Sequence, residues 1–181
     1  LAHCGGLVLN VTTPQTTNLP INLETLGLVS ERRGSSDFGD VQWWLEVYAA
    51  GGATASNATI NVTFNDDSTG NLNTIAVGAT INVGRMYGID ALRTTAQQGK
   101  NIKGINSITI SASTGTAGNF GFTATRPRAT LPIVVGNKME VFDWAQLGFP
   151  EIANDSCLFP MVLPTTTSSG TIRGGGKIAH G

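Results

Sequence analysis

Carboxylates are the side chains of this sequence best suited to acid–base chemistry. Glycosidases cleave sugars with two carboxyl groups that face each other across a cleft. Glu46, which stands in a tryptophan-rich segment, is the best candidate for the acid. Its candidate partners are all distant from it in the sequence: Asp37, Asp40, Asp90 and Glu140. Solvated or arginine-paired carboxylates are the simpler interpretation, because acidic side chains mostly lie at protein surfaces.

Nucleophilic catalysis has little support in the sequence. The two histidines, His3 and His180, stand near opposite ends of the chain, whereas a catalytic histidine must be held by a carboxylate beside its nucleophile. The sequence contains neither a G-x-S-x-G elbow nor a GKS or GKT phosphate loop. We therefore predict a protein that is not an enzyme and uses no cofactor.

Few residues are available as metal ligands. Cys4 and Cys157 are the two cysteines, and with two histidines they offer too little for a zinc site. We expect two buried thiols, with a disulfide that joins the ends of the chain as the alternative. Asp66 and Asp67 could bind calcium within a turn, but an ordinary turn is the favoured interpretation, so no metal is predicted.

Aromatic side chains suggest a second kind of site. Trp43, Trp44, Tyr48 and Trp144 could stack against sugar rings, as in a carbohydrate-binding module. Strand alternation places Trp43 and Trp44 on opposite faces, so at most one of them can join such a platform. Packing in a core or an interface is favoured. A carbohydrate-binding β-sandwich, in an adhesin or a receptor-binding module, remains the alternative function.

The composition fits either a surface that neighbouring subunits cover or an extracellular β domain. Only 13% of the 181 residues are charged, against about 25% in an average soluble domain. Neutral polar groups are easier to desolvate than charges, which suits a protein covered by neighbours, although an extracellular domain rich in Thr and Asn would look the same. The net charge of −1 gives no attraction to nucleic acid. The sequence has no run of about 18 apolar residues, the length that would indicate a membrane span.

Alternating apolar and polar residues, separated by Gly and Asn turns, predict an all-β fold. The expected strands are residues 7–11, 21–29, 41–50, 58–65, 74–83, 105–113, 120–125, 131–135 and 138–144. Residues 105–113 and 120–125 are expected to form a hairpin, and residues 87–98 either a helix or a further strand. Seven to nine short strands predict a single β-sandwich or jelly roll with extended N- and C-terminal arms.

The domain prediction separates a sandwich from an arm. Residues 1–144 are expected to form the sandwich domain, including an N-terminal arm, and residues 145–181 an extended C-terminal arm with a Gly-rich tail. Prolines exclude a central strand from the apolar part of this arm. We predict that the arm binds a partner through six residues: Phe149, Leu158, Phe159, Met161, Arg173 and Lys177.

Three segments have a distinctive composition: ATINVTFNDDSTGN, SITISASTGTAGNFGFTAT and DWAQLGFPEIANDSCLFPMVLP. They resemble virion proteins of tailed bacteriophages, and in style are most similar to the jelly-roll cement or decoration proteins. The resemblance implies a subunit on the capsid lattice, as a trimer, that clamps neighbouring major capsid proteins. The sequence has no separate lattice-binding signature, so a place in the head, tail or connector stays open.

We therefore expect a viral structural protein at the capsid surface, a homo-oligomer in contact with a major capsid or other virion protein. If the alternative function holds, the protein is extracellular.

Overall fold

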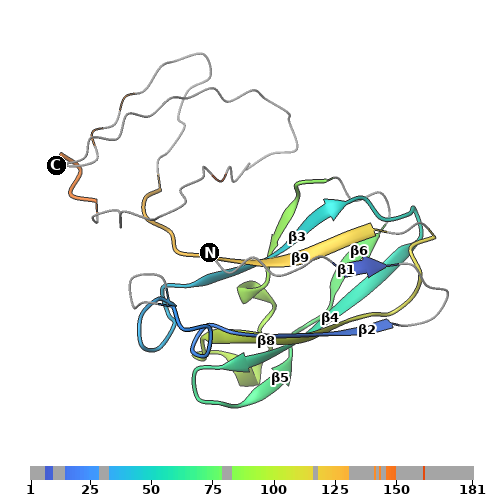
Figure 1. Cartoon of the computed structure of the whole chain (residues 1–181), viewed down its shortest axis with the longest axis horizontal. Helices are drawn as coiled ribbons and strands as arrows, with labels where there is room; N and C mark the ends of the chain where they lie inside the picture. The colour runs from blue at the N-terminus through green and yellow to red at the C-terminus, as the bar shows by residue number, and fades with distance from the viewer. Residues whose placement is uncertain are drawn as a thin grey trace.

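Two antiparallel sheets pack face to face in the computed structural model of the chain (Figure 1). The structure describes residues 7–9, 15–28, 33–78, 83–115, 118–130, 141, 143, 146–149 and 161. Within these residues the chain forms nine strands and two short 3-10 helices. The prediction of an all-β sandwich is confirmed.

Each sheet draws its strands from distant parts of the chain. Sheet A has the order β1-β9-β3-β7, and sheet B has the order β2-β8-β4-β5, with β6 also paired to β4. The strands of sheet A are β1 (Leu7–Leu9), β9 (Gly118–Thr125), β3 (Gln42–Ala49) and β7 (Met86–Gly88). Those of sheet B are β2 (Gln15–Asn22), β8 (Ile102–Ile110), β4 (Ala55–Phe64), β5 (Thr69–Asn71) and β6 (Ile75–Gly78).

The strand order is that of a jelly roll. Strands β5 and β6 pair with the two halves of β4, at Asn61–Thr63 and at Ala55–Ala58, so together they occupy one place in sheet B. With that place counted once, each sheet has four positions, and the chain crosses from one sheet to the other at most steps. Two interleaved four-stranded antiparallel sheets define the jelly-roll sandwich.

The core fills the space between the sheets. Its largest fully buried side chains come from the strands, with Ile89 beside them: Trp43, Leu45, Val47, Ile60, Val62, Phe64, Ile102, Ile105, Ile108, Phe120 and Phe122. Trp43 is fully buried, and its indole N–H donates to the carbonyl of Ile102 in the other sheet at 2.9 Å. Each such side chain contributes about 1.5–3 kcal/mol by its burial, so the alternating pattern of the sequence selects the sandwich.

The expected hairpin of residues 105–113 and 120–125 is wrong. Strand β8 lies in sheet B between β2 and β4, and β9 lies in sheet A between β1 and β3. Alternation shows which face of a strand is apolar, but it does not identify the neighbouring strand. Both strands bury apolar side chains toward the same core from opposite sheets, and this pattern looks the same in a sequence as that of a hairpin.

Several element boundaries also differ from expectation. The strand expected at residues 21–29 ends at Asn22, where a turn begins, and starts instead at Gln15. The expected strand 74–83 is a strand at Ile75–Gly78, and its next four residues lie outside the described part. Residues 87–98 hold the end of β7 and the 3-10 helices η1 (Asp90–Leu92) and η2 (Thr95–Gln97).

A capping box explains why the second 3-10 helix starts where it does. The Thr94 side chain and the Gln97 side chain cap each other's backbone N–H groups. Such reciprocal caps satisfy donors that a helix start leaves unpaired. Neither the full helix nor the full strand expected at residues 87–98 is therefore present.

Candidate functional site

Most of the charged side chains that the structure describes in the sandwich gather at one end of it, in the loops and at the strand ends. We call this set the charged rim. Its members are Glu24, Asp37, Asp40, Asp66, Asp67, Asp90, Arg93, Lys100, Lys103 and Arg126. Ion pairs and hydrogen bonds among the loops link these residues.

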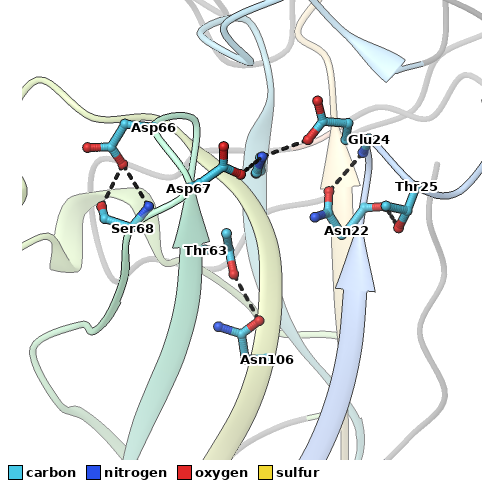
Figure 2. Close-up of polar contacts among 9 residues, drawn as sticks. Asn22, Glu24, Thr25, Thr63, Asp66, Asp67, Ser68 and Asn106 are labelled. Carbon is cyan, nitrogen blue, oxygen red and sulfur yellow. Dashed lines mark hydrogen bonds and ion pairs between the residues drawn. The ribbon is translucent and has the colours of Figure 1, made fainter.

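Lys103, on β8, is the centre of one half of the rim. Its side chain is only 3% exposed, and its amine contacts Glu24 at 2.6 Å and also Asp67. Figure 2 shows Asp67 and Glu24 on opposite sides of the nitrogen atom that both of them contact. The hydrogen bonds with Asp67 and then Glu24 raise the pKa of the Lys103 amine. Glu24 and Asp67 are 52% and 84% exposed. The two ion pairs therefore lie at the protein surface, where they connect the ends of three neighbouring strands.

Asp66 is also paired with a lysine. Lys100 contacts its carboxylate at 2.8 Å, and the Ser68 hydroxyl donates to it at 2.5 Å (Figure 2). The hydrogen bond with Lys100, followed by that from Ser68, holds the pKa of Asp66 well below its usual value. The predicted turn at Asp66 and Asp67 is confirmed between β4 and β5, although Thr69 and Gly70 belong to β5. The two aspartates pair with lysines.

Among the described residues, no three His, Cys, Asp or Glu side chains gather as a possible metal site. The absence of a metal therefore stays a prediction. Cys4, Cys157, His3 and His180 lie outside the described residues.

Asp37 and Asp40 share a serine in the loop before β3. The Ser35 hydroxyl lies 2.7 Å from Asp37 and 3.0 Å from Asp40, and Arg126 contacts the other oxygen of Asp40. The Ser35 hydroxyl lowers the pKa of Asp37. Burial acts to raise the pKa of Asp40, but hydrogen bonds from Ser35 and Arg126 outweigh it and lower the pKa. Both acids therefore stay ionised and structural.

Asp90 is the described acid whose surroundings favour the protonated form. Burial raises the pKa of its carboxyl, against the hydrogen bond that it accepts from the Trp43 backbone N–H at 2.8 Å. Arg93 lies 3.9 Å away. One carboxyl oxygen of Asp90 is bonded to the backbone N–H of Trp43, near the start of β3. We therefore assign this carboxyl a structural role.

Glu46, the proposed acid, lies on the outer face of sheet A. Its carboxylate accepts a hydrogen bond from the Thr123 hydroxyl of β9 at 2.7 Å. The outer face also holds Trp44, which is half-buried and donates its indole N–H to Thr125 at 2.8 Å. The opposite placement of Trp43 and Trp44 is confirmed. Of the candidate partners of Glu46, three have other partners, namely Asp37, Asp40 and Asp90, and Glu140 lies outside the described residues.

The outer face of sheet B is composed differently. We call it the Thr/Asn face, and it consists of Thr16, Asn18, Asn57, Thr59, Asn61, Thr63, Thr69, Asn71, Ala76, Asn106, Ser107 and Thr109. None of these residues is charged, aromatic or large and apolar. All are exposed or half-buried. The sequence signal was the Thr and Asn at alternate positions of residues 58–65, which we had interpreted only as a strand pattern.

The predicted partner-binding residues are described only in part. Phe149 and Met161 are half-buried, and Leu158, Phe159, Arg173 and Lys177 lie outside the described residues, as does Trp144. Two other apolar side chains of this region are far more exposed: Val141 at 80% and Leu147 at 49%. The sequence signal for Leu147 was its place in the proline-punctuated apolar stretch, from which we selected other residues.

No family model matches this chain, and searches of curated proteins and of solved structures returned no match. In the part of the chain that the structure describes, no helix is long and apolar enough to cross a membrane.

Proposed function

We propose that the protein is a structural subunit of a virus particle, a capsid cement or decoration protein that works through protein–protein contacts. It is a homo-oligomer, with a trimer favoured, and it binds a major capsid or other virion protein at the particle surface. The fold is compatible with this role, because jelly rolls are common in viral capsid proteins and in lectins.

The exposure of Val141 and Leu147 carries the proposal. Both follow β9, the last strand within the described residues, and they are 80% and 49% exposed. Large apolar side chains gain free energy when a partner removes them from water, at about 25 cal/mol for each Å². The segment that holds them therefore favours a partner chain, and on a repeating lattice several weak contacts of this kind add up through multivalency.

Leu26 provides a matched control for a test of self-association. It is 45% exposed, almost as much as Leu147, but it lies in the turn that follows β2. Sedimentation velocity of the full chain should show an oligomer. Leu147→Asp should weaken its assembly at least tenfold, and Leu26→Asp should leave it unchanged. A monomeric wild-type chain, or equal effects of the two substitutions, would contradict the proposed contact.

The second test concerns the tail. Deletion of residues 165–181, which removes Arg173 and Lys177, should reduce the amount of protein retained on purified virus particles. Retention can be measured by quantitative mass spectrometry of the particles. Unchanged retention would remove the tail from the mechanism.

A further inference from the structure

The Thr/Asn face is ordered by hydrogen bonds between its own side chains. The Thr63 hydroxyl donates to the Asn106 carbonyl oxygen at 2.9 Å (Figure 2), and the Asn106 amide donates to Asn61 at 2.8 Å. The Asn61 amide then donates to Asn71 at 2.6 Å. This directional chain crosses from β8 through β4 to β5, so it fixes the side chains before any ligand arrives.

A β-bulge adds Asn106 to this series of hydrogen-bonded side chains. The register between β4 and β8 shifts between Asn61 and Val62, which leaves Asn106 and Ser107 both on the outer face, since Ile105 and Ile108 on either side of them are buried. Bulges re-aim side chains in this way, often beside binding sites. Without this bulge, Asn106 would point into the core.

The strand register continues the array on both sides of the chain. Asn18, Ser107, Asn61 and Asn71 stand opposite one another across four strands. Thr16, Thr109 and Thr59 form the next row, in which Thr16 and Thr109 lie within hydrogen-bond distance, at 2.8 Å. The face therefore presents rows of neutral groups at the spacing of neighbouring strands, about 4.8 Å.

Each amide in the chain keeps part of its hydrogen-bonding capacity. An asparagine side chain has two N–H donors and two acceptor lone pairs. Asn61 uses one donor toward Asn71 and one lone pair toward Asn106. One donor and one acceptor of Asn61 remain, and a sugar hydroxyl, which both donates and accepts, can bond to either.

We propose that the Thr/Asn face binds a neutral polysaccharide. Uncharged, polyhydroxylated chains match a flat array of neutral donors and acceptors, and desolvating such groups costs less than desolvating charges. Fixed side chains reduce the entropy lost on binding. This inference does not rest on the proposed capsid role.

Other classes of ligand fit the face less well. Nucleic acids and anionic glycans need Lys or Arg at the contact, and Lys100 and Lys103 at the nearby rim are held by carboxylates. Protein partners usually anchor on aromatic, Met or Arg side chains, and the Thr/Asn face contains none. The face therefore differs from the Trp44 surface, where the sequence suggested sugar stacking.

Affinity electrophoresis of the full chain can test this proposal. Native gels would contain dextran, galactomannan or hydroxyethylcellulose as neutral probes, with alginate as the anionic probe. The wild-type protein should be retarded by at least one neutral polysaccharide and not by alginate. Asn61→Leu should weaken this binding at least tenfold. Asn73→Leu, which changes an exposed asparagine that lies outside the strands and whose amide contacts the Arg93 carbonyl oxygen, should bind as the wild type does.

Asn71→Leu gives a second variant in case Asn61→Leu does not fold. Asn71 is exposed and is the last residue in the series of hydrogen-bonded side chains. The substitution should also weaken binding, by a smaller factor. The proposal is overturned if no neutral polysaccharide retards the protein, if alginate alone does so, or if folded Asn61→Leu and Asn71→Leu variants bind as strongly as the wild type.

Discussion

The two outer faces of the sandwich differ in composition although both cover the same core. Sheet A exposes a strand with Trp44, Glu46 and Tyr48 on its outer side, and sheet B exposes Thr, Asn and Ser with no charge. The inner faces are alike, being built of Ile, Val, Leu and aromatic residues. The core therefore accounts for the fold, and differences in function must be sought on the outer faces and beyond the sandwich.

The two adjacent tryptophans of β3 test the difference between inner and outer positions most strongly. Trp43→Ala should destabilise the protein by about 3–5 kcal/mol, because it empties a fully buried site and removes the hydrogen bond to Ile102 in sheet B. Trp44→Ala, on the half-buried outer side, should cost about 1 kcal/mol. Urea denaturation followed by circular dichroism measures both. Equal costs would mean that the two faces of β3 are not distinct.

Two glycines, one in a strand of each sheet, allow the crowding around the two backbones to be compared. A Cβ at Gly104 of β8 would lie 2.5 Å from the Ile21 carbonyl oxygen, whereas a Cβ at Gly88 of β7 would meet the Trp44 ring at 3.4 Å. Gly104→Ala should therefore cost about 1–3 kcal/mol through overpacking. Gly88→Ala should stay within about 0.5 kcal/mol of the wild type. Thermal denaturation would contradict this comparison if Gly88→Ala were the more damaging of the two.

The hydrogen-bonded chain on the Thr/Asn face should contribute measurable stability. Asn61→Ala removes two side-chain hydrogen bonds and should cost about 1 kcal/mol. Asn73→Ala, at an exposed asparagine outside the strands whose amide makes only one long hydrogen bond in the described residues, to the Arg93 carbonyl oxygen at 3.5 Å, serves as the control and should cost less than about 0.5 kcal/mol. Denaturant midpoints for the two variants provide the measurement. If Asn61→Ala leaves the denaturant midpoint unchanged, the hydrogen bonds between the side chains of the Thr/Asn face are not ordered in solution.

The smallest expected effect is the alkaline titration of Lys103. Because its pKa is raised in the folded protein, its contribution is fully present below the unfolded value of about 10.4 and is lost as pH rises through the folded value. Both carboxylate partners are more than half exposed, so the effect should be about 1 kcal/mol or less. The stability difference between wild type and Lys103→Met should shrink above about pH 10.5. A constant difference would contradict the ion pairs.

The sequence predicted the fold class because alternation is a direct consequence of burying one face of a strand. It missed the start of β2 at Gln15, since this strand is mostly polar and its inner residues include Thr17. It also paired β8 with β9 wrongly, because crossovers between sheets leave no local pattern. These failures share one cause: sequence periodicity describes one strand at a time.

The surfaces were harder to predict than the strands. The Thr/Asn face depends on which strands are neighbours and on a bulge that turns Asn106 outward, and neither can be derived from spacing. The pairing of Lys103 with Glu24 joins residues that are 79 positions apart. By contrast, the opposite placement of Trp43 and Trp44 follows from their adjacency alone.

The most direct test of the proposed function is electron cryomicroscopy of virus particles assembled in cells that express the gene, with mass spectrometry of the same particles. We predict stoichiometric amounts of the chain and a two-sheet density the size of the sandwich at repeated positions on the outer capsid surface. Particles that lack the chain, or that carry no such density, would contradict the proposal.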